Sequence, residues 1–255
     1  VVIYVSFLAP LIYPCILVIA NVIKIAKITI TANNSINVKP LFLFNMRITI
    51  TRHSKTLWNK EKRLQGCKDS PLSPEGMDNI LALKEHIKNN HYDAIYSSPI
   101  KRAYDTAKLL FDNQPIITDE RIREMNFGLF EGQKIDEIPE KYKKTYHDLW
   151  CHPEISNGIP EGETYDEIEE RVKDFLNDLV KKPYDNVFIV THGFCFTIIM
   201  ATIMNLDRKD YIKVNSPVVD GCSETIVDYT NGAFTVEVYG NNDFLPHQSN
   251  ESFSK

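Results

Sequence analysis

The segment that most restricts the fold of this chain is the run Asn186–Thr191, because the residues between its two ends, Val-Phe-Ile-Val, are all apolar. A strand with one wet face alternates apolar and polar side chains, whereas a strand covered on both faces reads as a continuous apolar run. His192 and Gly193 follow at once, and then comes an apolar segment to about Met204 that we expect to be a buried helix. This pattern predicts a central strand of a mainly parallel sheet with helices on both faces.

The other predicted elements fit this architecture. Strands are expected at residues 46–51 and 92–97, and helices at residues 75–90, at residues 98–111 with Ser98 as N-cap, and at residues 164–180. Asn231 and Gly232 predict a hairpin turn between strands at 223–230 and 233–239, and the polar tail after Gly240 is expected to fray. Since strands and helices alternate, the predicted fold class is α/β: a three-layer α/β/α sandwich with a mainly parallel central sheet.

The first 45 residues have a different composition from the rest of the chain. They contain three lysines and no Asp, Glu, Arg, His or Gly. Residues 1–23 are uncharged and long enough to span a membrane, but Pro10 and Pro14 interrupt the run. Met46 then opens the first predicted strand. We therefore expect residues 1–45 to be an apolar N-terminal extension outside the folded domain, or an anchor, and residues 46–255 to form one domain; membrane association is expected only if residues 1–23 are that anchor.

Composition excludes several classes of protein. The 255 residues are 43% hydrophobic and 25% charged, which is typical of a globular protein rather than a disordered or collagen-like one. The formal charge of −5 argues against a nucleic-acid partner. Five cysteines without a Cys-x-x-Cys pair indicate a reducing compartment, so the predicted location is cytoplasmic.

Charged and polar residues follow three of the predicted strands. Arg52 and His53 follow the first, Arg102 lies in the helix after the second, and His192 follows the apolar strand. Each residue alone is more often structural or surface-exposed than catalytic. Ligands of parallel α/β sheets bind beyond the carboxyl ends of the strands, where helix N-termini favour anions. The coincidence at three strand ends therefore predicts an anion site.

The motifs at these positions resemble those of the histidine phosphatase superfamily, also called the phosphoglycerate mutase-like family. The main one is Arg-His-Ser-Lys-Thr-Leu-Trp-Asn at residues 52–59. The similarity continues at residues 64–66, 69–76, 97–107, 122–132, 162–164 and 191–193. It spans residues 46–205 and implies a phosphoglycerate mutase-like fold.

The resemblance implies a role for each matching residue. His53 matches the nucleophile that becomes phosphorylated, and Glu124 matches the acid that protonates the leaving oxygen. Arg52, Arg102 and His192 match the pocket that holds the transferring phosphoryl group, and Asn59 matches a polar contact to it. Glu120, Glu131 and Glu137 lie nearby and are expected at the surface. No cofactor is implied, and no cluster has metal-ligand spacing.

Ser54 departs from the family pattern, which has glycine after the histidine. Serine fits if φ is negative, and its hydroxyl could then donate to phosphate. Lys68 likewise follows Cys67 where the family usually has arginine after the Gln-Gly pair. The aromatic residues Tyr142, Tyr146 and Trp150 fall where the family has a lid or substrate wall, although core packing explains them equally well.

The function predicted from these motifs is a metal-independent phosphomonoesterase that acts through a phosphohistidine on a small phosphate ester. The alternative is a cofactor-dependent phosphoglycerate mutase. The stretch Glu-Met-Asn-Phe-Gly after Arg123 resembles the phosphatase branch and disfavours the mutase. A phospho-ligand binding module with weak catalysis, motivated by Ser54, is a third reading. The expected partner is a small phosphorylated substrate of unspecified identity, and a homodimer is compatible with the sequence.

Overall fold

The computed structural model describes residues 45–215 and 218–248. The predicted extension therefore lies outside the described residues, apart from Asn45. Within the described part, no helix is long and apolar enough to cross a membrane.

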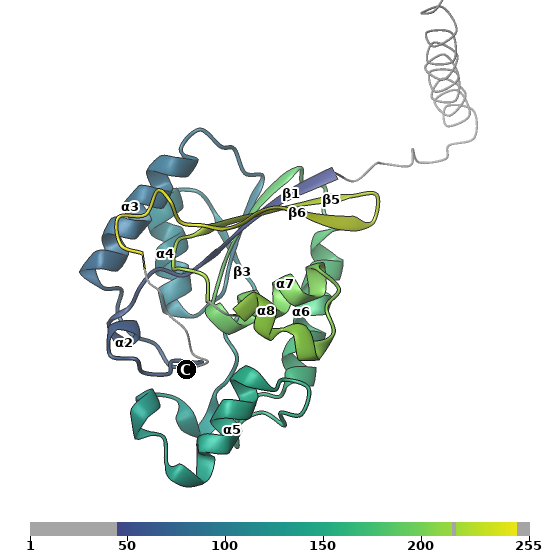
Figure 1. The fold of residues 1–255 in the computed structure, drawn as a ribbon. Coiled ribbons are helices and arrows are strands. Elements are labelled where there is room, and N and C mark those ends of the chain that lie inside the picture. Colours follow the sequence, from purple (N-terminus) through teal and green to yellow (C-terminus); the bar gives the residue numbers. More distant parts are fainter. Residues whose placement is uncertain (1–44, 216–217, 249–255) are drawn as a thin grey trace, which may run out of the picture. The chain divides into compact units, whose positions relative to one another are not determined.

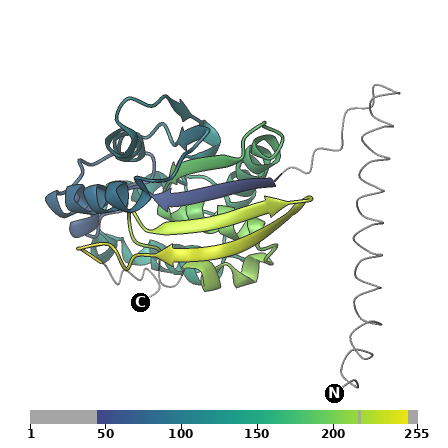
Figure 2. The ribbon, with the colours of Figure 1, turned by 90° about the horizontal axis from the view of Figure 1, so that it is seen from above.

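The core of the fold is a six-stranded sheet with the strand order β3-β2-β4-β1-β5-β6. β4 pairs in parallel with β2 and β1, and β2 pairs in parallel with β3, whereas β5 and β6 extend the sheet antiparallel. Figure 2 shows this antiparallel end, where β1 (purple) lies beside the two yellow-green strands. The prediction of a mainly parallel sheet with a central apolar strand is thus confirmed. The strands are β1 (Asn45–Arg52), β2 (Ala94–Ser97), β3 (Ile116–Thr118), β4 (Asn186–Thr191), β5 (Glu224–Thr230) and β6 (Ala233–Asn241).

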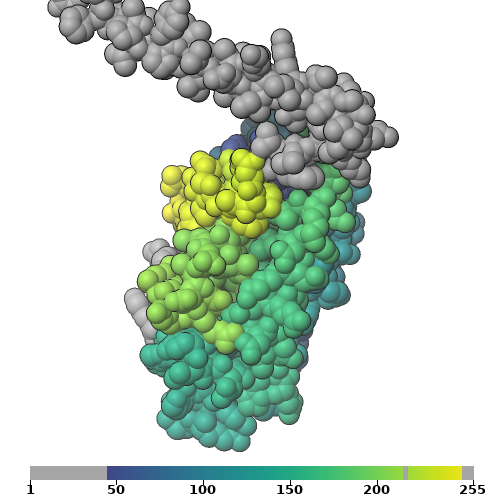
Figure 3. Space-filling view, turned by 90° about the vertical axis from the view of Figure 1, so that its right-hand side faces the viewer, coloured from purple at the N-terminus to yellow at the C-terminus, as the bar shows by residue number. Residues whose placement is uncertain are grey.

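Helices cover both faces of the sheet (Figure 1), as the apolar character of β4 requires. Successive β4 side chains point to opposite faces: Phe188 and Val190 join one buried cluster, and Val187 and Ile189 join the other. The first cluster packs against α3 (Pro74–Ile87) and α4 (Lys101–Phe111). The second packs against α6 (Tyr165–Leu179) and α7 (Gly193–Ile203), with α6 shown in green in the side view of Figure 3. The three-layer sandwich is therefore confirmed.

Among the described residues, the remaining elements are three α-helices and four 3₁₀ helices. The α-helices are α2 (Leu57–Lys60), α5 (Glu140–Cys151) and α8 (Ile212–Asn215). The 3₁₀ helices are η1 (Glu120–Ile122), η2 (Gly128–Phe130), η3 (Ile135–Glu137) and η4 (Arg208–Asp210).

Local signals explain several element boundaries. Thr164 caps α6 by accepting from the Glu167 backbone N–H, while the Glu167 side chain accepts from the Thr164 backbone N–H. Asn231 and Gly232 both have positive φ, as the predicted two-residue hairpin turn requires. These boundaries follow from sequence-local chemistry, which is why they were predictable.

Two predictions fail. Ser98 does not cap α4, which begins at Lys101 after Ile100; the Ser98 hydroxyl accepts from the Ile100 backbone N–H at 3.2 Å and lies 2.7 Å from His192 Nε2. The tail after Gly240 does not fray as far as His247, because Leu245 is buried and Asn79 exchanges two hydrogen bonds with the His247 backbone. Both failures come from contacts between segments far apart in the sequence.

Candidate active site

The sheet brings the three predicted strand ends together. Arg52 lies beside Thr191 in the register of β1 and β4, and Ser97 lies beside Val190 in that of β2 and β4. The His53 backbone N–H then donates to Thr191 O at 2.8 Å, which continues the parallel pairing past the strand ends. The residues after these strands consequently meet at one edge of the sheet, as predicted.

Two hydrogen bonds orient the His53 ring. Nδ1 lies 2.7 Å from Ser54 O, and Arg102 Nε donates to His53 Nε2 at 3.1 Å. Because a carbonyl only accepts and a guanidinium only donates, the proton resides on Nδ1 and the lone pair on Nε2. Burial, together with the positive charges of Arg102 and Arg52, holds the pKa of His53 well below its usual value. His53 is therefore a neutral imidazole whose unprotonated Nε2 faces the Arg102 guanidinium.

The Arg102 side chain is buried and is fixed by backbone carbonyls. Its Nη2 donates to Gly66 O at 2.8 Å, and its Nη1 donates to Lys68 O at 2.7 Å. The Asp69 carboxylate receives the Arg102 backbone N–H at 3.1 Å. Only a guanidinium supplies donors in this many directions, so the charge is held in one place beside His53.

The His192 ring lies next to the His53 ring, with the ring centroids 5.1 Å apart. It is fully buried, and its Nδ1 makes no hydrogen bond within the described residues. Burial and the charge of Arg102 hold the pKa of His192 well below its usual value. This neutral imidazole thus presents an unsatisfied buried nitrogen, which is costly unless a ligand engages it.

The Glu124 carboxylate sits on the N-terminus of α7. Its Oε1 accepts from the backbone N–H groups of Met125 and Cys195, both at 3.0 Å, and its Oε2 accepts from Phe194 N at 3.2 Å. The carboxylate is 7% exposed and borders the same pocket as His53. Backbone donors therefore set its position, and Oε2 retains the greater capacity for a further partner.

Four of the six predicted site residues line one pocket: Arg52, His53, Asn59 and Glu124. Arg102 and His192 are absent from its lining and lie behind it, in contact with His53. The Asn59 Oδ1 accepts from the Thr56 backbone and hydroxyl, which leaves its amide NH₂ as the donor end. The space among these lining residues is about 440 Å³ when the open solvent at its mouth is included.

Sequence reasoning did not select Gln65 as a site residue, yet it lines this pocket. Its side chain is 7% exposed, and its Oε1 has no hydrogen-bond partner within the described residues. The only available signal was its place in the Leu-Gln-Gly motif at residues 64–66.

Five of the residues that line the pocket are apolar, and we call them the pocket wall. Trp150 reaches it from α5, in the aromatic stretch where a wall was predicted, whereas Tyr142 and Tyr146 pack on Phe130 instead. Arg63 supplies a positive charge among the wall residues. The pocket wall consists of Leu64, Phe127, Trp150, Phe194 and Val218.

Ser54 has a structural contact rather than the predicted phosphate contact. Its hydroxyl donates to Gly76 O at 2.7 Å, and its backbone N–H donates to the Thr106 hydroxyl at 3.1 Å. It is absent from the residues with positive φ, so serine fits this position without strain. Within the described residues, no group of three or more His, Cys, Asp and Glu side chains could hold a metal ion.

A parallel α/β sheet that delivers two histidines and two arginines beside a carboxylate-lined pocket defines a phosphoryl-transfer class of protein. Residues 48–242 match the model of the histidine phosphatase superfamily (branch 1), so the chain belongs to this superfamily.

Individual relatives are consistent with that membership. A Hydrogenobacter thermophilus protein with the provisional name phosphoserine phosphatase 2 is 35% identical over 58% of this chain and 73% of its own length. A Yersinia pestis protein with the provisional name phosphoglycerate mutase GpmB is 30% identical over 72% of this chain and 85% of its own length. The solved structure of Bacillus stearothermophilus YhfR, 30% identical, covers 78% of this chain and 99% of its own, with a TM-score of 0.73.

Proposed function

We propose that this chain is a metal-independent phosphomonoesterase that hydrolyses small phosphate esters through a phosphohistidine at His53. The observation that carries the proposal is the His53 ring, whose Nδ1 proton is held by Ser54 O while Nε2 keeps its lone pair. An imidazole attacks phosphorus only through such an unprotonated nitrogen. The burial that lowers the pKa of His53 keeps that nitrogen unprotonated at neutral pH.

In the first step, His53 Nε2 forms a bond to phosphorus while the bond from phosphorus to the ester oxygen breaks. Glu124 enters this step protonated and gives its proton to that oxygen, and the alcohol leaves. In the second step, water attacks the phosphohistidine, its proton goes to Glu124, and the P–N bond breaks to release inorganic phosphate. Covalent catalysis divides one difficult displacement into two easier ones.

The remaining site residues would hold the charge of the phosphoryl group. Arg102 Nε, which contacts His53 Nε2 in the structure, would turn its proton to a phosphoryl oxygen once phosphorus takes the lone pair. Arg52 and the Asn59 amide border the same space, and His192 Nδ1 would gain a partner. Fixed donors around the three equatorial oxygens are the main source of catalysis in phosphoryl transfer.

The second candidate is a phosphoglycerate mutase, which returns the phosphoryl group from histidine to the substrate. The relative named phosphoglycerate mutase favours it. Against it stands the stretch Glu-Met-Asn-Phe-Gly after Arg123, which resembles the phosphatase branch of the family. If the protein isomerises 3-phosphoglycerate faster than it hydrolyses it, the mutase assignment replaces the phosphatase one.

The test is hydrolysis of p-nitrophenyl phosphate by the purified protein in EDTA. His53→Ala should abolish both hydrolysis and the acid-labile phosphoenzyme trapped from radiolabelled substrate. His91→Ala, which removes an exposed imidazole on the surface, is the matched control and should retain full activity. Undiminished turnover in His53→Ala would refute the mechanism, and phosphate-ester binding without any phosphoenzyme would support the binding-module reading.

The same proposal includes a cytoplasmic location, which the free thiols of Cys67, Cys151, Cys195 and Cys222 favour. It also assigns residues 46–255 to the histidine phosphatase domain and leaves residues 1–45 outside the chemistry. The homodimer stays a prediction, to be checked by sedimentation. Intact mass of the native protein will show whether residues 1–45 are present.

A further inference from the structure

The Arg171 side chain of α6 donates hydrogen bonds to the backbone of the segment that contains Glu124. Arg171 Nη1 donates to Arg121 O at 2.7 Å and to Arg123 O at 2.9 Å, and its Nη2 donates to Glu124 O at 3.3 Å. Its remaining donors go to Glu163, with Nε to Oε1 at 2.7 Å and Nη2 to Oε2 at 2.9 Å. These five contacts match the five N–H groups of a guanidinium, so the side chain has no rotational freedom left.

Glu163 accepts hydrogen bonds from Arg171 and also from Arg123, which lies in the same segment as Glu124. Its carboxylate accepts from both Nη1 and Nη2 of Arg123, at 3.1 Å each. Arg123 Nη1 in turn donates to Glu124 O at 3.0 Å, so two guanidinium groups share that carbonyl. The Glu163 backbone N–H donates to Asn126 O at 2.8 Å, beyond Glu124 in the sequence.

The two central side chains of this hydrogen-bond network, Arg171 and Glu163, are largely buried. The Glu163 side chain is 6% exposed and the Arg171 side chain 12%. Burial opposes ionisation of both groups and is the largest single influence, but the hydrogen bonds and charge attraction around them together outweigh it, so the pKa of Glu163 is lowered and that of Arg171 is raised. Both groups therefore remain charged at neutral pH. Removing Glu163 would take away the carboxylate that pairs with Arg171, whereas removing Arg171 would leave Glu163 its ion pair with Arg123.

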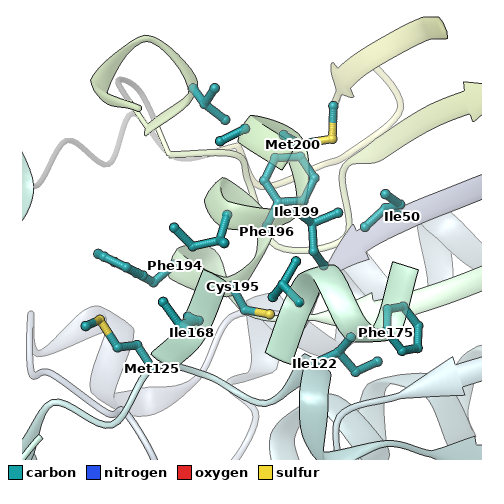
Figure 4. Close-up of a cluster of buried hydrophobic side chains, with 14 of the residues drawn as sticks. Ile50, Ile122, Met125, Ile168, Phe175, Phe194, Cys195, Phe196, Ile199 and Met200 are labelled. Atoms are coloured by element: carbon teal, nitrogen blue, oxygen red, sulfur yellow. The ribbon is translucent and has the colours of Figure 1, made fainter. Parts of the chain in front are cut away.

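Glu124 is thus held from two directions. Its carboxylate is fixed by the N-terminus of α7, and its backbone is fixed by Arg171 and Arg123. Figure 4 shows part of the hydrophobic cluster around this junction, in which Met125 is drawn near Ile168 of α6, and Ile122 is drawn near Phe175 of the same helix. The loop therefore has hydrogen bonds and apolar contacts to two helices.

We propose that Arg171 and Glu163 are positioning residues that hold the Glu124 carboxylate at the leaving-group oxygen. The inference rests on the proposed role of Glu124 as the acid. Protonation matters most for a strongly basic alkoxide and least for a stable phenolate such as p-nitrophenolate. Displacing the carboxylate should consequently slow the hydrolysis of alkyl phosphates much more than that of p-nitrophenyl phosphate.

The experiment compares two substrates, phosphoserine and p-nitrophenyl phosphate, in the full-length protein. Arg171→Lys keeps the charge but provides three donors instead of five in a fork. A displacement of about 1 Å at a catalytic group costs up to about 100-fold. Glu124 also takes part in hydrolysis of the phosphohistidine, which both substrates share, so the comparison uses kcat/KM, which reports only the steps up to formation of that intermediate. We expect kcat/KM for phosphoserine to fall about 10-fold or more, while kcat/KM for p-nitrophenyl phosphate changes less than about threefold.

Three further variants make the outcomes separable. Arg208→Lys alters another α6-bound guanidinium, paired with Asp166 and Glu169, and should slow neither substrate selectively. Glu163→Gln weakens the same network without changing Arg171 and should reproduce the selective loss, which keeps the test decisive if Arg171→Lys does not fold. Glu124→Gln should show the largest selective loss.

If Glu124→Gln lowers kcat/KM for both substrates equally, the proposed acid role fails. If Glu124→Gln is selective but Arg171→Lys and Glu163→Gln slow both substrates equally, or neither, the positioning inference alone is overturned. Melting temperatures measured alongside separate a loss of folded protein from a loss of acid catalysis.

Discussion

The two ends of the pocket are built in different ways. At the phosphate-binding end, Arg52, His53 and His192 come directly after or at the end of parallel strands, and the sheet register places them. The pocket wall instead collects its residues from loops and from helices α5 and α7. The first end is determined by backbone pairing in the middle of the fold, and the second by contacts among peripheral segments.

This difference separates chemistry from substrate choice. A sheet edge holds charges in fixed positions whatever the loops above it contain, so the phosphoryl-binding machinery is insensitive to changes in the wall. Loops tolerate substitution and insertion, which makes the wall the part that sets the leaving group. Variants at the two ends should therefore differ in the kinetic parameter that they change.

Arg102→Lys should give the largest effect at the phosphate-binding end. Lysine cannot reach Gly66 O, Lys68 O and His53 Nε2 together, so the positive charge moves away from the phosphoryl oxygens. Loss of one preorganised donor of this kind costs about 10²- to 10³-fold, and we expect that loss in kcat for p-nitrophenyl phosphate and phosphoserine alike. Arg47→Lys, at an exposed ion pair, is the control. A loss below threefold would show that the strand ends do not supply the stabilising charge.

The sequence predicted the phosphate-binding end better than the wall for the same physical reason. His53 follows an alternating strand and His192 follows a continuous apolar one. Both patterns are visible over a few residues, and adjacency to a strand end is enough to place the two histidines. The Arg171–Glu163 network and the Ser98–His192 contact join segments far apart in the chain, so no local pattern reports them. The short edge strand Ile116–Thr118 was missed because three residues are too few to show alternation.

Acid should destabilise the folded protein through the two histidines of the phosphate-binding end. The pKa values of His53 and His192 lie well below their usual value of about 6.5, so each binds its proton more readily when the chain is unfolded. Their contribution to stability is complete above pH 6.5 and declines below it, by up to about 1.4 kcal/mol per pH unit for each histidine. Urea unfolding between pH 7 and pH 5 measures this slope.

His192→Asn should roughly halve that slope, because one of the two titrating groups is gone. Carboxylates with lowered pKa values, such as Glu163, lose their contribution only at more acidic pH and so leave this window largely to the histidines. A flat profile between pH 7 and pH 5 would contradict the neutral state of both imidazoles.

A smaller, wall-specific effect is expected from Trp150→Leu. The indole packs on Phe127 and Phe194, with ring centroids 5.9 Å and 5.2 Å away, and borders the pocket. Leucine keeps the site apolar but removes the aromatic contact that we expect between the indole and the p-nitrophenyl ring. Such a contact is worth about 0.5–1.5 kcal/mol, so KM for p-nitrophenyl phosphate should rise about threefold to tenfold with little change in kcat. Initial-rate kinetics test this, with the melting temperature as a check on folding. A drop in kcat at unchanged KM would mean that the wall positions reacting groups, and the contrast between the two ends would disappear.

The smallest effect is expected at Ser54, which adjoins His53 yet acts as part of the scaffold. Its buried hydroxyl donates to Gly76 O, so Ser54→Ala should lower the free energy of unfolding by about 1 kcal/mol and leave kcat/KM within about twofold. Ser54→Gly, which installs the residue usual in the family, should lose somewhat more stability because glycine adds freedom to the unfolded chain. Chemical denaturation and kinetics of both variants measure the two quantities separately. A tenfold loss of kcat/KM in Ser54→Ala at unchanged stability would instead assign the hydroxyl to the phosphoryl group, and would require the side chain to leave Gly76 when substrate binds.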